Sequence, residues 1–140
     1  MVTIHSAQVI GLHATLIPIE VDVSPGLHVF SIVGLADKEV QESRERVGAA
    51  VRNIDGRSPH KQSGRIIVSL APADIKKEGP HFDLPIALGY LVASRQAIFN
   101  PNKKLFLGEL GLDGTLRPVR GVLSIALAAE KAGFTELFVP

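Results

Sequence analysis

Apolar and polar residues alternate along the first third of the chain, and the alternation predicts β-strands. Within residues 13–23 the branched residues Ile17, Ile19 and Val21 share one parity, while Glu20 falls on the other. Side chains of a strand point to opposite faces in turn, so a period of two indicates a strand with one buried face. We expect a half-buried strand here.

Two further strands are expected on either side of that segment. Residues 3–10 mix β-branched and polar residues, and residues 28–33 form a short apolar run. Gly11-Leu12 is short enough for a tight connection, and Ser24-Pro25-Gly26 has the composition of a turn. Three successive strands with short links predict an antiparallel meander.

Helical periodicity occurs in three segments. Valines recur at helical spacing within residues 36–54, and Asp37 near the start of this segment is a good N-cap residue. Residues 82–94 are apolar on most of their circumference, which is typical of a helix buried on several sides. Residues 121–133 form the third helix, with Ile125 facing inward.

The remaining strands are shorter. Residues 65–70 and 136–139 are β-branched or apolar runs, and Asp113-Gly114 separates apolar runs at 104–112 and 115–119. An Asp-Gly pair in this position is a strong hairpin signal. Together the elements predict one α+β domain over residues 1–140, a two-layer α/β arrangement with N-terminal antiparallel strands and three helices.

Composition agrees with one globular domain and excludes several classes. The chain has 140 residues, 46% hydrophobic and 21% charged, with a net charge of +1. It has no cysteine, which excludes disulfides, thiolate zinc sites and a cysteine nucleophile. No signal peptide or membrane-length apolar run is recognisable, so we expect a cytoplasmic protein with no membrane partner.

Nucleotide and metal motifs are missing. No Gly-Lys dipeptide occurs, so the phosphate loop that binds ATP is absent, and no glycine-rich dinucleotide motif follows a strand. The five histidines are scattered without metal-ligand spacing. We expect no cofactor and no metal in this chain.

The first candidate site is the segment before the second helix. It could present backbone N–H groups to an anion or a substrate, because a helix N-terminus carries a positive partial charge. The simpler alternative is a constrained turn in which Asp83 caps the helix. The residues concerned are Lys77, Glu78, Gly79, His81 and Asp83.

The second candidate site is a basic loop after the first helix. Arg52, Arg57, Lys61 and Arg65 are offset there only by Asp55 and are candidates for contact with a DNA backbone. No aromatic residues interleave to stack on bases. An ordinary solvated loop is the alternative.

Ordered blocks spread over nearly the whole chain resemble a known family. They are Gly34–Asp37, Glu42–Val47, Leu70–Asp74, Lys77–Pro80, Phe82–Ala87, Gly108–Leu110, Leu112–Gly114 and Arg117–Gly121. This pattern is similar to the N-terminal domain of magnesium-chelatase-like AAA+ proteins of the ComM or YifB type. The resemblance implies the fold of ribosomal protein S5 domain 2, shared with the proteolytic domain of Lon.

Lon-type proteases use a serine and a lysine, and the resemblance places both positions in this chain. The serine follows Gly-Pro in the family, and here His81 follows Gly79-Pro80. The lysine position is occupied by Leu123. A serine nucleophile needs a base within hydrogen-bond reach, so the resemblance implies no peptidase activity. A divergent hydrolase that uses His81, Asp83 and Glu78 remains the alternative.

The family also implies partners. Its members carry an AAA+ ATPase module that uses ATP and Mg, assemble into hexameric rings, and act in DNA processing during competence, recombination and branch migration. The resemblance therefore implies an accessory domain that contacts its ATPase module, neighbouring subunits or DNA. Because the chain stops on an apolar strand, we expect it to be a fragment of a longer protein.

Overall fold

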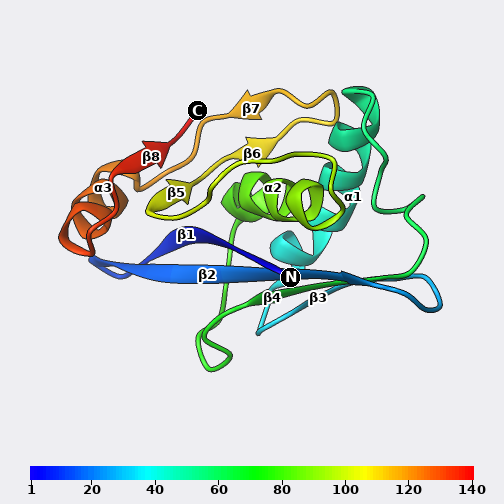
Figure 1. The fold of residues 1–140 in the computed structure, drawn as a ribbon. Coiled ribbons are helices and arrows are strands. Elements are labelled where there is room, and N and C mark those ends of the chain that lie inside the picture. Colours follow the sequence, from blue (N-terminus) through cyan, green and yellow to red (C-terminus); the bar gives the residue numbers. More distant parts are fainter.

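A six-stranded mixed sheet forms the frame of the molecule, and the computed structural model describes all residues from 1 to 140 (Figure 1). The strand order is β3-β4-β2-β1-β5-β8, and β6 and β7 form a separate hairpin. The strands are β1 (Val2–Ile10), β2 (His13–Ser24), β3 (Val29–Val33), β4 (Arg65–Leu70), β5 (Lys104–Phe106), β6 (Glu109–Leu110), β7 (Leu116–Arg117) and β8 (Glu136–Phe138). The helices are α1 (Lys38–Asn53), α2 (Asp83–Ala93) and α3 (Val122–Lys131).

The alternation in β2 is confirmed by its burial. Ile17, Ile19 and Val21 are fully buried in the main core, whereas Glu20 is partly exposed and Asp22 is exposed. β1 runs antiparallel to β2 from Val2↔Val21 to Ile10↔His13. The predicted tight connection at Gly11-Leu12 is therefore also confirmed.

The predicted three-stranded meander is wrong at its third strand. β3 pairs in parallel with β4, and β4 lies between β3 and β2. Parallel strands need a long crossover, which residues 34–64 supply through α1. Alternation within a strand reports which face is buried and carries no information about which strand lies beside it.

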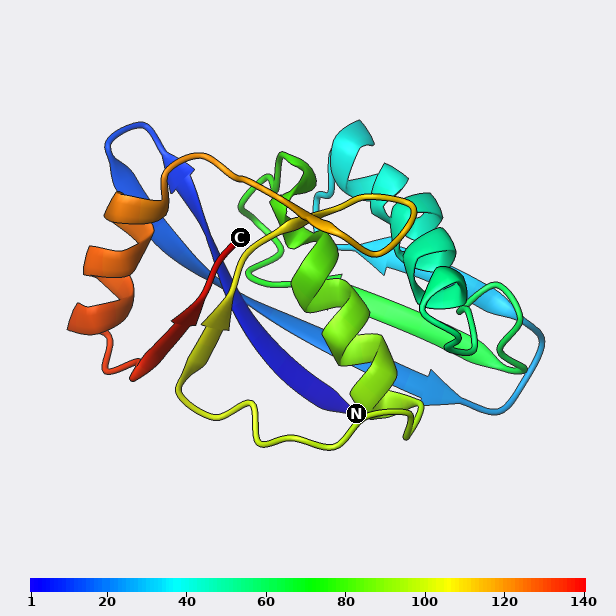
Figure 2. The ribbon, with the colours of Figure 1, turned by 90° about the horizontal axis from the view of Figure 1, so that it is seen from above.

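Helix α2 lies between the sheet and the β6–β7 hairpin, as Figures 1 and 2 both show. Phe82, Ile86 and Tyr90 are fully buried, so the expectation of a helix buried on several sides is confirmed. The close approach depends on Gly89, where an added Cβ would lie 2.5 Å from a methyl carbon of Val21. Any larger residue would push α2 away from β2.

Helix α3 packs on the opposite face of the sheet. Ala7 of β1 joins a second core with Leu105, Ile125 and Ala129, whereas Ile4 lies beside Gly89 of α2. Residues of opposite parity point to opposite faces of a strand. The two-layer prediction thus describes the part of the sheet under α1 and α2, and α3 adds a third layer over β1 and β2.

The ends of the other elements differ from the prediction in small ways. The first helix begins at Lys38, and Asp37 caps it as predicted, accepting a hydrogen bond from Val40 N at 2.9 Å. The expected strand 104–112 is divided into β5 and β6, because Gly108 N bonds to His81 O and draws the chain towards α2. The hairpin at Asp113-Gly114 is confirmed by the β6–β7 pairing.

No helix is both long and apolar enough to cross a membrane.

Candidate functional site

A wide cleft lies where β1 ends. Its volume is about 990 Å³, and its walls come from residues 8–11, the loop 75–81, the start of α1, Glu109 and the segment 118–121. The cleft therefore brings together the segments 75–81 and 118–121, which the resemblance drawn from the sequence relates to the nucleophile and base regions of a Lon-type site. No serine, threonine, tyrosine or cysteine lines it.

A buried glutamine holds the loop that forms one wall of the cleft. The Gln8 amide nitrogen donates to Lys76 O at 2.7 Å, and its amide oxygen accepts from Glu78 N at 2.9 Å. Gln8 is only 5% exposed. Two hydrogen bonds from one buried side chain fix the loop in one conformation. Gln8 was not predicted from the sequence, although a polar residue on the core face of a strand was the available signal.

Lys77 holds the same loop from the other side and does not face the cleft. Its side chain is fully buried, and Nζ donates to Gly34 O at 2.8 Å and to Pro72 O. No carboxylate forms an ion pair with it, and burial lowers the pKa of its ammonium. The cation considered for an anion-binding loop thus bonds to two backbone carbonyls, and Lys77 is not part of the cleft lining.

Asp83 is fully buried and joins three elements. Its carboxylate accepts from Arg46 Nε at 2.6 Å, from Leu110 N at 3.1 Å and from the Ser43 hydroxyl. The predicted capping role is wrong, because Phe82 occupies the N-cap position of α2 and no side chain caps the helix. The short length of the Asp side chain and the nearby α1 direct the carboxylate towards Arg46 instead.

His81 lines the cleft at the place where the nucleophile would stand in a Lon-type site. Its Nε2 lies 2.9 Å from Ala7 O, to which only a protonated Nε2 can donate. The ring also packs against Phe82, with centroids 4.1 Å apart. Burial lowers the pKa of His81, and the Ala7 hydrogen bond and the charge of Asp83 act in the opposite direction. The imidazole is therefore neutral at pH 7 and bonded to the backbone of β1.

The residues considered for a divergent hydrolase do not converge. Glu78 is exposed and pairs with Lys76 at 3.5 Å, while Asp83 is buried beside Arg46, away from the cleft. Leu123 lies on α3 with 75% of its side chain exposed and does not line the cleft. The structure thus brings Glu78, Gly79 and His81 to one cleft and separates them from Lys77, Asp83 and Leu123.

Carboxylates outnumber cations around the cleft. Asp37, Glu39, Glu78 and Glu109 line it, against Lys76 and Arg120. Glu109 pairs with Arg117 at 3.6 Å, and Glu39 takes part in no ion pair. Glu39 and Glu109 were not predicted as part of this site, because they come from α1 and β6. No group of three or more His, Cys, Asp or Glu side chains is arranged to hold a metal ion.

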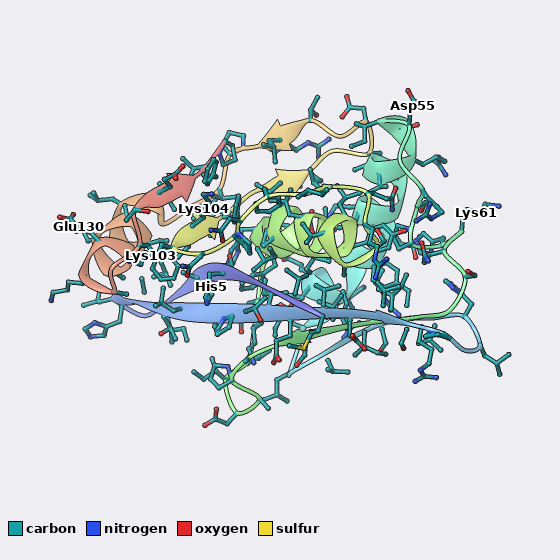
Figure 3. All side chains as sticks on the ribbon, viewed as in Figure 1. His5, Asp55, Lys61, Lys103, Lys104 and Glu130 are labelled. Carbon is teal, nitrogen blue, oxygen red and sulfur yellow. The ribbon has the colours of Figure 1, made fainter.

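The basic candidates lie at the other end of α1. Figure 3 shows Lys61 and Asp55 at the end of the molecule opposite Glu130 of α3. The loop is anchored, since the buried Tyr90 donates its hydroxyl to Arg57 O at 2.6 Å and Gln96 Oε1 accepts from Arg57 N at 2.7 Å. No ion pair neutralises the four cations, which are Arg52, Arg57, Lys61 and Arg65.

Comparison with known proteins identifies the family. The family described as subunit ChlI of Mg-chelatase matches residues 19–140, and the chain belongs to it. The resemblance noted in the sequence is thereby confirmed.

Named relatives make the relationship more specific. The chain is 45% identical to the competence protein ComM of Haemophilus influenzae over 130 residues, 92% of the chain and 25% of the relative. It is 41% identical to the YifB protein of Escherichia coli over 131 residues, 93% of the chain and 25% of the relative. It is also 35% identical to the DNA repair protein RadA of Streptococcus pneumoniae over 66 residues, 47% of the chain and 16% of that protein. The chain spans about a quarter of the length of ComM and YifB.

Proposed function

We propose that the chain is a non-catalytic accessory domain of a magnesium-chelatase-like AAA+ ATPase that acts in DNA processing, in competence, recombination or branch migration. The similarity to the competence protein ComM and the partial overlap with the DNA repair protein RadA support this role. In this account the domain supplies a binding surface and leaves the chemistry to other parts of a longer protein in the cytoplasm.

The observation that carries the proposal is the state of the cleft. It keeps the two blocks that a Lon-like fold with the S5 domain 2 architecture uses for catalysis, yet it offers no hydroxyl or thiol. His81 replaces the serine, and its Nε2 is bonded to Ala7 O. Leu123 replaces the lysine and has no basic group. Nucleophilic catalysis needs a nucleophile and a base in contact, and neither partner is supplied here.

ATP and Mg belong, in this proposal, to an AAA+ module outside these residues. A phosphate loop needs a glycine-rich turn ending in Lys and Ser or Thr, and the chain contains no Gly-Lys pair. The domain would then contact that module and the neighbouring subunits of a hexameric ring.

Two assays on the purified chain test the proposal. Titration with MgATP is expected to give no binding, and incubation with casein is expected to give no cleavage. The divergent hydrolase alternative predicts cleavage, but the positions of Glu78 and Asp83 on different sides of the loop argue against it. Cleavage that depends on His81 would refute the non-catalytic role.

A direct contact with DNA through the basic loop is a second candidate function. The specific observation in its favour is that Arg52, Arg57, Lys61 and Arg65 are free of ion pairs. The Tyr90 and Gln96 bonds hold the backbone of the loop in place, so little conformational entropy would be lost when phosphates bind. Salt-dependent binding to duplex DNA is the corresponding test.

A further inference from the structure

The pairing of β1 with β2 determines which way the N–H and C=O groups of each β1 residue point. His5 lies opposite Pro18, which has no N–H, so this antiparallel pair cannot be a hydrogen-bonded one. Pro18 O accepts instead from Ala71 N, on the far side of β2. Hydrogen-bonded and non-hydrogen-bonded pairs alternate along an antiparallel ladder. The N–H and C=O groups of His5, Ala7 and Val9 therefore all point away from β2.

The bond from His81 agrees with this assignment, since Ala7 O accepts from His81 Nε2 on the side away from β2. On that side β1 pairs with β5, but only at His5↔Leu105. Val9 makes no turn, loop or side-chain hydrogen bond, and its place in the ladder rules out a bond to β2. One residue of β1 thus presents an unpaired backbone donor and acceptor.

Val9 presents these groups to the 990 Å³ cleft, which it lines together with Ile10. Their side chains are 39% and 44% exposed. An open strand edge beside exposed apolar side chains is the arrangement that accepts an extended peptide as an added strand. The loop held by Gln8 stands as the opposite wall, so the groove is already formed.

The charges of the cleft select the partner. Four carboxylates and two cations line it, and Arg117 offsets Glu109 from outside the lining, which leaves the cleft with a small net negative charge. Nucleic acid and acidic peptides would meet net repulsion, whereas lysine or arginine side chains would be attracted. Glu39, which has no ion-pair partner, is the carboxylate most available to such a side chain.

We propose that this cleft binds an extended, basic segment of a polypeptide, which pairs with the backbone of Val9 and directs a lysine or arginine towards Glu39. The inference rests on the interaction role proposed above and names the class of partner. It does not depend on the basic loop or on DNA.

Amide hydrogen exchange of the free chain tests the strand edge first. The Val9 amide is expected to exchange faster than the amides of Gln8 and Ile10. In the register with β2, Gln8 and Ile10 form hydrogen-bonded pairs with Thr15 and His13, so their N–H groups are protected. A Val9 amide as protected as its two neighbours would overturn the proposal, because the edge would then be occupied. This measurement involves neither catalysis nor nucleotide.

Peptide binding tests the partner. The probe is a fluorescein-labelled octapeptide of alternating valine and lysine, and the control peptide replaces lysine with glutamate. We expect the lysine peptide to bind at least tenfold more tightly and to slow exchange at Val9. Binding of the glutamate peptide, or of a single-stranded oligonucleotide, as tight as that of the lysine peptide would overturn the proposal, as would no binding of the lysine peptide at millimolar concentration.

Two variants at the same residue separate backbone from side chain. Val9→Pro removes the N–H that points away from β2, and proline is tolerated on such an edge. Val9→Ala keeps the N–H and trims the side chain. We expect Val9→Pro to weaken binding of the lysine peptide roughly three- to tenfold more than Val9→Ala. Equal affinities of the two folded variants would contradict strand addition.

Glu39→Lys tests the contribution of charge even if Val9→Pro does not fold. Unchanged affinity of Glu39→Lys for the lysine peptide would contradict the proposed contact with a basic side chain. Failure of these tests would leave the non-catalytic role to be judged by the casein assay alone.

Discussion

Arg46 of α1 and Asp83 at the start of α2 form an ion pair with 2.6 Å between Arg46 Nε and Asp83 Oδ2. The carboxylate is fully buried and also accepts from Leu110 N, so one side chain joins α1, α2 and β6. Its attraction to Arg46 raises the pKa of the guanidinium, against the effect of burial. The pair lies behind the cleft wall and fixes the orientation of α2.

Replacing Asp83 is expected to destabilise the fold strongly. Asp83→Ala leaves the partly buried Arg46 without its counter-charge and Leu110 N without an acceptor. Losing one partner of a buried pair costs about 3 kcal/mol. Urea denaturation followed by circular dichroism measures the change in the free energy of unfolding.

The partly exposed pair between Glu109 and Arg117 is the matched control. Arg117 Nη1 lies 3.6 Å from Glu109 Oε1, and the Arg117 side chain is largely exposed. Glu109→Ala is expected to cost less than about 1 kcal/mol. Equal losses in the two variants would mean that Asp83 does not join the elements as described.

Lys77 is predicted to stabilise the fold through its two carbonyl acceptors. Lys77→Met keeps most of the apolar stem but leaves Gly34 O without its donor, whereas Pro72 O keeps its bond from Ile75 N. One unsatisfied buried group costs about 1–3 kcal/mol, so we expect a loss in that range. Lys76→Met, next to it and mostly exposed, is the control and should change stability by less than roughly 0.5 kcal/mol. A Lys77→Met variant as stable as Lys76→Met would be inconsistent with the structure.

His81 makes stability depend on pH in the acidic range. Burial lowers its pKa below the unfolded value, so the unfolded chain binds more protons as the pH falls. The contribution is fully present above the unfolded pKa of about 6.5 and is lost as the pH falls from there towards the folded pKa. His5 has a pKa lowered by burial and acts in the same direction.

Thermal melting between pH 7.5 and pH 5 measures this effect. We expect the melting temperature of the wild type to fall on acidification and that of His81→Gln to fall less. His13→Gln, at an exposed position, is the control and should follow the wild type. A steeper decline in His81→Gln than in the wild type would show that the sign is wrong.

The basic loop is predicted to govern any binding to DNA. Arg57→Ala combined with Lys61→Ala should weaken binding to duplex DNA uniformly across sequences and lower the slope of log affinity against log salt by about 2. Fluorescence anisotropy at several salt concentrations measures both quantities. Lys131→Ala combined with Lys103→Ala removes the same charge from two exposed positions outside the loop. If both pairs weaken binding equally, the loop is not the contact.

The sequence predicted most of the elements because their signals are local. Alternation at Ile17 and Ile19 identified the buried face of β2, Asp37 identified the start of α1, and Asp113-Gly114 identified the β6–β7 hairpin. The neighbour of β3 was not predictable in this way. Pairing of β3 with β4 depends on the path of the chain through α1, which leaves no mark on either strand.

The contacts of the candidate site could not be predicted from the sequence. The blocks at Gly79-Pro80 and Pro118–Gly121 do meet at one cleft. The direction of each side chain is set by residues distant in sequence, such as Arg46 for Asp83 and Gly34 for Lys77. A segment that reads as one loop therefore divides into residues that face the cleft and residues that hold the fold together.

Casein cleavage by the purified chain tests the central claim most directly. Fluorescein-labelled casein is incubated with the wild type and with His81→Ala, and release of fluorescent peptides is followed over hours. The account predicts no release above buffer in either sample, because the cleft has no hydroxyl or thiol nucleophile and the proposed base position carries Leu123. Release by the wild type that disappears in His81→Ala would contradict it.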